Sequence, residues 1–356
     1  MTTRGSLSIG LPPETCNQVN GLSLKAGVTE RGAVLLGNYV ACDAFDEKPI
    51  RVVTHAHADH MAGLPQSLRT CEKVLMTPAT RDLIEVIRGP LLFERGNVET
   101  LEYGQSIQYD GEKITFFKAD HILGAAQVLV EDAEGKKMVF TGDFRLEETP
   151  ILYSNYLVIE ATYGSPCCKR SFGIDIRASL VQLVEKGLRT GAVYVFGYHG
   201  KLQEVMQILH DADVEVPFVM PENVYHFSKV CEKHGMKFGQ MHFSSERVAR
   251  EMLEENLPCI AFYHMNQKNK VGLDGFRVCV SGWEFTSAIR RTGDKEYIVA
   301  LSDHSDFDGL LEYVRRSEPE LVITDNSRVS HGETLAKEIR KRMGISAVAL
   351  PKNCLF

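Results

Sequence analysis

The sequence lacks several features that would set it apart from ordinary soluble globular proteins. No apolar run approaches the length needed to cross a bilayer, and the start lacks the apolar segment of a signal peptide. The nine cysteines are scattered, odd in number and without a C-x-x-C pair, which argues against a disulfide framework or a thiolate zinc site. We therefore expect reduced thiols and a cytoplasmic protein without a membrane partner.

An excess of positive charge is also missing. The formal net charge is −7 over 356 residues, a length that allows one large or two modest domains. Bulk charge therefore does not indicate a nucleic-acid partner, which would need a local basic surface. Basic pairs such as Lys169 and Arg170, and the run at 340–342, are candidates, and solvated helix faces explain them equally well.

Histidine and aspartate are instead concentrated in the segment "HAHADH". His55 and His57 are two residues apart, so at the end of an extended strand they point to the same side. Asp59 and His60 follow where the chain turns toward a helix. Neutral imidazoles and carboxylates are the donors that zinc accepts, so the segment predicts a metal site. A histidine-rich surface loop is the alternative.

Two further ligand candidates lie downstream, each after a strand pattern. The six-residue segment has too many ligands for one open tetrahedral site and too few for two. His121 follows the alternating run "ITFFKAD", and Asp143 ends the run "KMVFTGD". Both placements fit a two-metal site in which one carboxylate bridges the ions.

The rest of the chain alternates strand and helix patterns. Hairpin turns are predicted at Asp110-Gly111 and at Glu134-Gly135. A helix beginning at "PATRD" should stop at Gly89, and a charged helix should be capped by Gly344. From residue 174 on, helix and strand alternate as in an α/β module.

In combination, these motifs resemble the metallo-β-lactamase fold superfamily and, within it, the β-CASP nucleases. The general fold rests on "HAHADH", His121 and Asp143. The β-CASP branch rests on the motifs "LVIEATYGSP", "VALSDHSDFDGLL" and "SHGETLAKEI", and on a Gly-basic-x-Gln segment in "FGYHGKLQEV". The chain looks most like ligase-associated prokaryotic exonucleases and the nucleases that process RNA 3′ ends.

The resemblance implies a mixed α/β fold, a four-layer αββα sandwich into which an α/β cap domain is inserted. The expected boundaries are 1–166 for the first part of the sandwich, 167–287 for the cap and 288–356 for the second part. The active site would lie in the cleft between sandwich and cap.

The resemblance also implies the metal ligands. Asp143 would bridge two zinc ions, with manganese as an alternative in one or both sites. Asp43, in "VACDAF", would support the ligand histidines by hydrogen bonding, although it could equally be a turn aspartate that ends a strand. The remaining ligands would be His55, His57 and His121 for the first ion, and Asp59, His60 and His331 for the second.

Catalytic roles follow from the same resemblance. His304, held cationic by Glu160, would donate a proton to the leaving oxygen, and Asp59 is counted with these two catalytic residues. Lys201 would contact a substrate phosphate, unless it is simply the basic residue at a helix start.

One departure affects the second metal site. In the relatives the third-motif histidine usually follows its strand directly, whereas "DNSRVSHGE" places a short insertion before His331. Asp325 or His304 therefore remains an alternative ligand.

The expected function is a two-zinc nuclease that hydrolyses phosphodiester bonds, in the first instance as an exonuclease. The alternatives are a thioester- or lactone-type metallo-hydrolase and a non-catalytic β-CASP scaffold. RNA and DNA both remain open as substrates, and so does a homodimer as the assembly.

Overall fold

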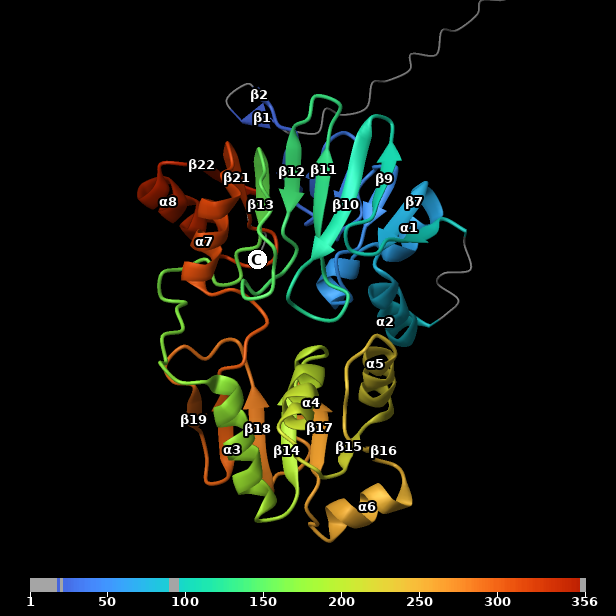
Figure 1. The fold of residues 1–356 in the computed structure, drawn as a ribbon, viewed down its shortest axis with the longest axis vertical. Helices are drawn as coiled ribbons and strands as arrows, with labels where there is room; N and C mark the ends of the chain where they lie inside the picture. The colour runs from blue at the N-terminus through green and yellow to red at the C-terminus, as the bar shows by residue number, and fades with distance from the viewer. Residues whose placement is uncertain (1–17, 20–21, 90–95, 353–356) are drawn as a thin grey trace, which may run out of the picture.

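The chain folds into two bodies that lie end to end, as Figure 1 shows. The computed structural model describes residues 18–19, 22–89 and 96–352. We call the upper part of Figure 1 the first body; it carries β1–β13, β21, β22, α1, α2, α7 and α8. The lower part, which we call the cap, carries β14–β20 and α3–α6.

The first body contains two large sheets. A six-stranded sheet has the order β3 (Ala26–Val28), β4 (Val34–Leu36), β5 (Val40–Cys42), β6 (Ile50–Val52), β7 (Lys73–Met76) and β8 (Val98–Thr100). A seven-stranded sheet has the order β22 (Ser346–Leu350), β21 (Leu321–Asp325), β13 (Tyr156–Ile159), β12 (Lys137–Phe140), β11 (Ala126–Glu131), β10 (Glu112–Lys118) and β9 (Ser106–Tyr109). The short strands β1 (Gln18–Val19) and β2 (Leu22–Ser23) pair with each other.

These sheets pack face to face and are covered by helices on their outer sides. Leu36 of the first sheet and Phe116 and Phe140 of the second belong to one buried apolar cluster. The outer face of the seven-stranded sheet packs on α7 (Phe307–Ser317) and α8 (Gly332–Met343), and α1 (Leu64–Thr70) and α2 (Pro78–Arg88) join the buried residues of the six-stranded sheet. The predicted αββα sandwich is confirmed.

The cap is a parallel α/β module with one antiparallel edge strand. Its sheet has the order β16 (Met241–Phe243), β15 (Phe218–Met220), β17 (Ile260–His264), β14 (Val193–Gly197), β18 (Phe276–Val280), β20 (Glu296–Val299) and β19 (Ile289–Arg291). Its helices are α3 (Ile176–Leu188), α4 (Lys201–Asp211), α5 (Glu222–Lys233) and α6 (Arg247–Glu254).

The cap sheet extends beyond the boundary at residue 287 that the sequence suggested. β20 pairs in parallel with β18, and β19 pairs with β20, so the strands after 287 still belong to the cap. The chain returns to the first body only after Val299, because those strands have their hydrogen-bonding partners in the cap sheet.

The hairpin turns and helix ends predicted from the sequence are present in the structure. The β9–β10 hairpin turns at Asp110-Gly111, where both residues have positive φ (43° and 84°), and β11 and β12 pair across the predicted turn at Glu134-Gly135. α2 ends before Gly89 and α8 before Gly344, which has φ 69°. Within the described part of the chain, no helix is both long and apolar enough to span a bilayer.

The cap and the first body share an apolar interface and ion pairs. Leu83 of α2 and Phe227 of α5 belong to the same buried cluster. Beside them, Asp82 of α2 accepts from Lys233 at 2.7 Å and pairs with His234 at 2.7 Å. This contact fixes the side of the cap opposite α3.

A buried guanidinium ties the loop after β6 to its strand. Arg51 is 1% exposed. It donates to the carbonyls of His60 at 3.2 Å and Ala62 at 3.3 Å, and also to that of Asp43. Because the same loop carries the "HAHADH" segment, Arg51 connects the stability of the sandwich to the geometry of the histidines.

We expect Arg51→Met to lower the free energy of unfolding of the first body by about 2–4 kcal/mol, because several buried carbonyls lose their donor. Urea unfolding followed by far-UV circular dichroism measures the change. Arg69, exposed on α1, provides the matched control Arg69→Met, which should change stability by less than about 0.5 kcal/mol. Equal unfolding midpoints for the two variants would contradict the role of Arg51.

Candidate metal centre

The strand β6 leads directly into the predicted ligand segment. Its three residues are all buried, and the chain then runs through Thr54 and His55 into a short 3₁₀ turn, Ala58–Met61. His55 and His60 are fully buried at the base of this loop, whereas the side chain of Asp59 is 60% exposed at its edge. The loop thus presents its histidines inward and one carboxylate outward.

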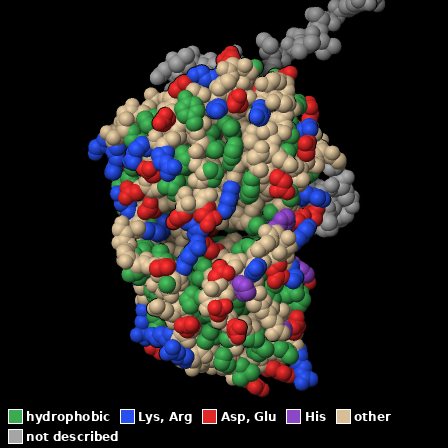
Figure 2. All heavy atoms as spheres, in the orientation of Figure 1, with side chains coloured by type: hydrophobic (Ala, Val, Ile, Leu, Met, Phe, Trp, Pro, Cys, Tyr) green, Lys and Arg blue, Asp and Glu red, His purple; other side chains and the backbone are tan. Residues whose placement is uncertain are grey.

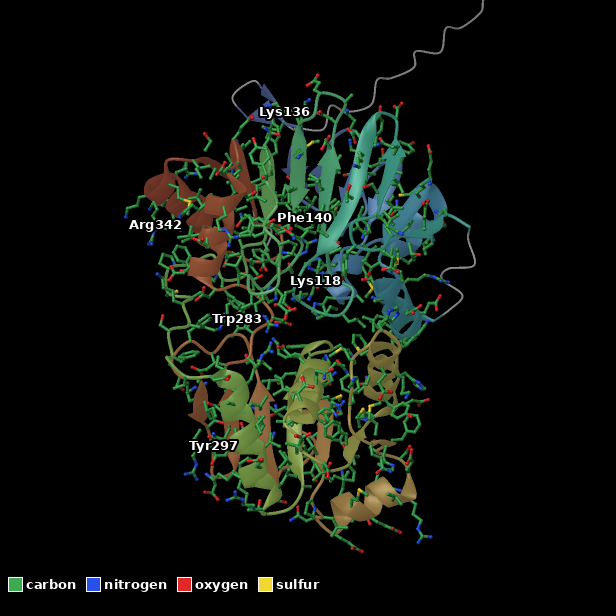
Figure 3. The ribbon with its side chains drawn as sticks, viewed as in Figure 1. Lys118, Lys136, Phe140, Trp283, Tyr297 and Arg342 are labelled. Carbon is green, nitrogen blue, oxygen red and sulfur yellow. The ribbon has the colours of Figure 1, made fainter. Side chains whose placement is uncertain are left out.

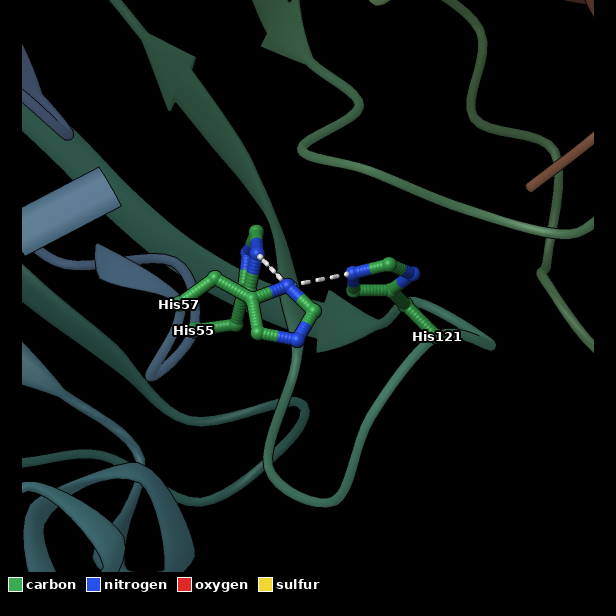
Figure 4. A group of neighbouring side chains, drawn as sticks. All are labelled: His55, His57 and His121. Atoms are coloured by element: carbon green, nitrogen blue, oxygen red, sulfur yellow. Dashed lines mark hydrogen bonds between the residues drawn. The ribbon is translucent and has the colours of Figure 1, made fainter. Parts of the chain in front are cut away.

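Three histidine nitrogens converge on one point, as Figure 4 shows. Nδ1 of His57 lies 3.1 Å from Nε2 of His55 and 3.1 Å from Nε2 of His121. A single proton on that Nδ1 cannot serve two acceptors, so these contacts are not a satisfied hydrogen-bond pair. Burial is the largest influence on all three rings and lowers the pKa of each, that of His121 to about 3, so they are neutral.

The opposite nitrogen of each ring has its own acceptor. His57 donates from Nε2 to the carbonyl of His199 at 3.2 Å, and His121 donates from Nδ1 to the carbonyl of Asp303 at 2.8 Å. Nδ1 of His55 lies 3.1 Å from the hydroxyl of Thr54. Since carbonyls only accept, the converging nitrogens of His57 and His121 carry lone pairs, which is what a metal ion requires.

A second group of donors lies beside the first. Oδ2 of Asp143 is 3.2 Å from Nε2 of His60, 3.8 Å from that of His55 and 3.9 Å from that of His121. Oδ2 of Asp59 is 3.3 Å from Nε2 of His60. Asp143 therefore lies within reach of both groups, the position a bridging carboxylate would take.

The buried Nε2 of His60 has no hydrogen-bond partner among the described residues. Its Nδ1 is held by Asp43 at 2.7 Å, and Asp43 also accepts from the backbone and hydroxyl of Thr54 at 2.9 Å. Asp43 is fully buried, with φ 65°. A buried nitrogen that lies 3.2 and 3.3 Å from two carboxylates without a well-formed hydrogen bond fits a cation that the three groups share.

The donor set accordingly fits divalent metal ions. Ligand atoms within 4.8 Å of one another form three groups, which consist of His55, His57 and His121; His55, His60 and Asp143; and His121, Asp143 and His304. Neutral imidazoles with carboxylates suit zinc and similar borderline ions.

His304 is paired with the predicted carboxylate. Its Nδ1 lies 2.9 Å and 3.1 Å from the two oxygens of Glu160, which is 3% exposed. Burial lowers the pKa of His304, but Glu160, and after it Asp143 and Asp303, outweigh burial and raise the pKa to about 9. The ring therefore carries a proton at neutral pH.

The structure does not bring His331 into the ligand groups. Its Nδ1 lies 3.1 Å from the carbonyl of Thr162, and its ring packs at 6.3 Å from that of Trp283. The residue nearer to the second group is Arg328, whose Nε is 3.9 Å from Oδ2 of Asp59 and whose Nη1 pairs with Asp325.

Lys201 lies at the start of a helix and is held by an ion pair. It is 7% exposed at the start of α4, and its Nζ lies 2.9 Å from Oδ1 of Asp303. The sequence left Lys201 open as a phosphate contact or as the basic residue at a helix start. In the structure its ammonium is a buried ion-pair partner that lines the same cavity as His304.

These residues surround a cavity between the two bodies. It has a volume of about 610 Å³, and a second cavity of about 830 Å³ shares His304 with it. Figure 2 shows the molecule hollowed between the upper and lower parts, with acidic and basic side chains along the hollow. The site thus opens at the interface of the first body and the cap.

Sequence reasoning missed four contributors: Thr54, Asp303, Arg328 and the carbonyl of His199. Each adjoins a motif residue, which was the available signal. Their roles depend on backbone carbonyls and on ion pairs between residues that lie 102 to 269 positions apart in the sequence. Examples are the pairs of Lys201 with Asp303 and of Arg328 with Asp59. Such pairings leave no periodic pattern in a single sequence.

Comparisons with known proteins agree with this geometry. A model of the beta-lactamase superfamily domain matches residues 46–162. The "uncharacterized protein in lig 3′ region" of Acidianus ambivalens is 35% identical over 138 residues, 38% of this chain and 99% of that protein. The RNase J-like protein of Methanocaldococcus jannaschii is 28% identical over 227 residues, 55% of this chain and 53% of its own length. The chain thus spans about half of that curated relative.

A solved structure shares the fold over most of both bodies. It is that of a protein of unknown function from Enterococcus faecalis V583, with a TM-score of 0.60 and 15% sequence identity. The similarity covers 87% of this chain and 81% of the other. With the ligand segment, the His304–Glu160 pair and the inserted cap all in place, the chain belongs to the metallo-β-lactamase superfamily, in its β-CASP branch.

Proposed function

We propose that this protein is a metal-dependent nuclease that hydrolyses phosphodiester bonds of RNA or DNA. The observation that carries the proposal is that His57, Asp59 and Asp143, which are candidate metal ligands, line the same cavity as the protonated His304 and its partner Glu160. A phosphodiester needs both, because it is anionic and its leaving alkoxide is poor. The name of the RNase J-like relative supports the same chemistry.

The proposed metal complement is two zinc ions, with manganese as the alternative. His55, His57 and His121 would hold the first, His60 and Asp59 the second, with Asp143 between them. When bound, such ions lower the pKa of water to form a nucleophile and neutralise the phosphate. His331 stays a proposed additional ligand of the second ion, since its Nδ1 is held by a carbonyl in the same manner as His121.

The chain's own part in the reaction is proton control. Glu160 fixes Nδ1 of His304 and leaves Nε2 as the second N–H of the ring. As the P–O bond breaks, the leaving oxygen takes the proton from Nε2, and the ring becomes neutral beside Glu160. A carboxylate that raises the pKa of the ring to about 9 keeps the proton in place until that step.

Two charged groups, Lys201 and Arg328, would position the substrate. Lys201 holds Asp303, whose carbonyl accepts from His121, so a change at Lys201 would act on the metal ligand as well as on the phosphate. Arg328 is held by Asp325 and by the carbonyl of Gly32 at 3.0 Å, which aims its guanidinium at the edge of the site. We also propose a cytosolic location; the described cysteines are all free thiols.

The proposed function is tested with purified protein, divalent metal and end-labelled single- and double-stranded RNA and DNA. A ladder that starts from one end would support the exonuclease proposed from the motifs, and discrete internal products would identify an endonuclease. Hydrolysis of thioesters or lactones without cleavage of any nucleic acid would overturn the proposal in favour of a small-molecule hydrolase.

We expect elemental analysis of purified protein to give about two divalent ions per chain. His60→Ala should reduce this to about one, because it removes a direct ligand of the second ion and leaves the first group intact. The exposed His226 on α5 provides the matched control His226→Ala, which should retain both ions. The variant His331→Ala tests whether His331 is a ligand of the second ion, because loss of a direct ligand should lower the metal content.

Absence of stoichiometric metal from the unchanged protein would contradict the mechanism as a whole. Full retention of metal by His60→Ala would contradict the second site.

We expect His304→Ala to retain its metal but to lose about two to four orders of magnitude in the rate of nucleic-acid cleavage, the usual contribution of a positioned general acid. Bis(p-nitrophenyl) phosphate has a leaving group that needs no proton, so its hydrolysis should fall far less. Steady-state rates on both substrates, with metal content measured on the same samples, test this. Equal losses on both substrates, or loss of metal, would contradict the role of His304 as an acid.

A further inference from the structure

The cavity carries an exposed aromatic side chain that the proposed chemistry does not use. Trp283 follows the carboxyl end of β18, at the junction of the two bodies (Figure 3), and lines the same cavity as Asp143 and His304. It is 58% exposed, although it is the only tryptophan of the chain. An indole left in water on the wall of a reaction cavity indicates a ligand that covers it.

The loop that carries Trp283 is fixed on its inner side. A Cβ at Gly282 would lie 2.2 Å from the hydroxyl oxygen of Tyr163, so only glycine allows this close approach. Arg170 donates to the carbonyl of Gly282, and the amide of Trp283 donates to Ser281 at 3.2 Å. The indole is therefore held in position before any ligand arrives, which lowers the entropy cost of binding.

Trp283 is also close to the reacting groups. The buried ring of Tyr163 meets that of Trp283 edge to face at 5.0 Å and that of His304 at 5.7 Å. One side chain therefore separates the indole from the proposed general acid. A part of the substrate that covers the indole would therefore lie next to the phosphodiester at His304.

Two further aromatic rings line the cavity. Tyr198 follows β14, is 55% exposed and meets His264 edge to face at 5.1 Å. Both residues line the cavity of about 610 Å³, a size typical of sites that enclose one small ligand. Of the parts of a nucleic acid, only the bases offer flat apolar faces to such walls.

We propose that Trp283 stacks on an unpaired nucleobase adjacent to the cleaved phosphodiester, so that the protein acts on single-stranded nucleic acid. The inference rests on the proposed nuclease function and adds the form of its substrate. A base inside a duplex has both faces covered by its neighbours, so an exposed indole can stack on an internal base only after that base has left the helix. Stacking tolerates every base, so it predicts little sequence preference.

The single tryptophan makes binding directly observable. Within the first turnover in a stopped-flow instrument, a single-stranded hexanucleotide should quench the emission of the metal-loaded protein. A blunt duplex of the same sequence should quench it much less. Tyr153, 53% exposed and outside the cavity, provides the matched control Tyr153→Ala, which should give the same quenching as the unchanged protein.

Steady-state kinetics then test whether the contribution of Trp283 depends on a single base of the substrate. Trp283→Ala should lower kcat/KM for the single strand about 5- to 150-fold, the range for one lost base–aromatic stack. The loss on bis(p-nitrophenyl) phosphate should be at least about tenfold smaller, because that substrate has no base to stack. Trp283→Phe should recover part of the activity. A substrate with an abasic site next to the cleaved bond should show a similar loss, and Trp283→Ala should add little to it.

The outcomes separate this inference from the function on which it rests. Failure of the unchanged protein to cleave any nucleic acid or small diester would overturn the nuclease function, and the fluorescence titration would still test the stacking. Equal losses of Trp283→Ala on both substrates, full additivity with the abasic site, or quenching by duplex alone would overturn the stacking of an unpaired base. Quenching by single strands together with a non-additive abasic effect would establish it.

Discussion

The structure depends on one constraint: to hold metal, four imidazoles, of which His55 and His60 are fully buried, would each have to present an unprotonated nitrogen to a shared space. Each ring therefore needs an acceptor on its far side. The first body supplies Asp43 for His60, whereas His57 donates to a carbonyl of the cap. His121 donates to the carbonyl of Asp303, in the segment that returns from the cap. A metal site at these residues would be complete only when both bodies are in place, because the cap fixes the tautomers of His57 and His121.

The two bodies satisfy this constraint through the direction of their strands. β6, β10, β12 and β13 of the first body and β14, β17, β18 and β20 of the cap all end at the junction, and in Figure 1 the arrowheads of several of these strands point to it. The carboxyl ends of parallel strands collect loops whose side chains need not fit a ladder, which is why ligands gather there in α/β folds. Here two such edges face each other, so His199 and Trp283 of the cap lie opposite the histidines of the first body.

The sequence predicted those features of the structure that depend only on neighbouring residues. The spacing of His55 and His57, the positive φ at Gly111 and the cap at Gly344 each depend on a few neighbouring residues, and the structure has all of them. The motif resemblance extended this to the pairing of Glu160 with His304, 144 positions apart. The continuation of the cap sheet to Val299 could not be foreseen, since pairing of β20 with β18 depends on a partner strand and not on the strand's own pattern.

Electrostatics also determines the setting of two basic residues at the site. Lys201 and Arg328 were available to attract a phosphate, but in the structure they face Asp303 and Asp325, which compensate most of their charge. Asp59 and Asp143, which line the cavity, add negative charge beside the imidazole of His60. A phosphodiester approaching these donors alone would meet net repulsion, which is strong where little water screens it. The two divalent ions proposed above would reverse the sign of the local charge. Their occupancy would therefore govern whether an anionic substrate can enter, before it governs the chemistry. The acidic bulk charge of the chain matters less, because exposed carboxylates more than about 8 Å from the site are largely screened at physiological ionic strength.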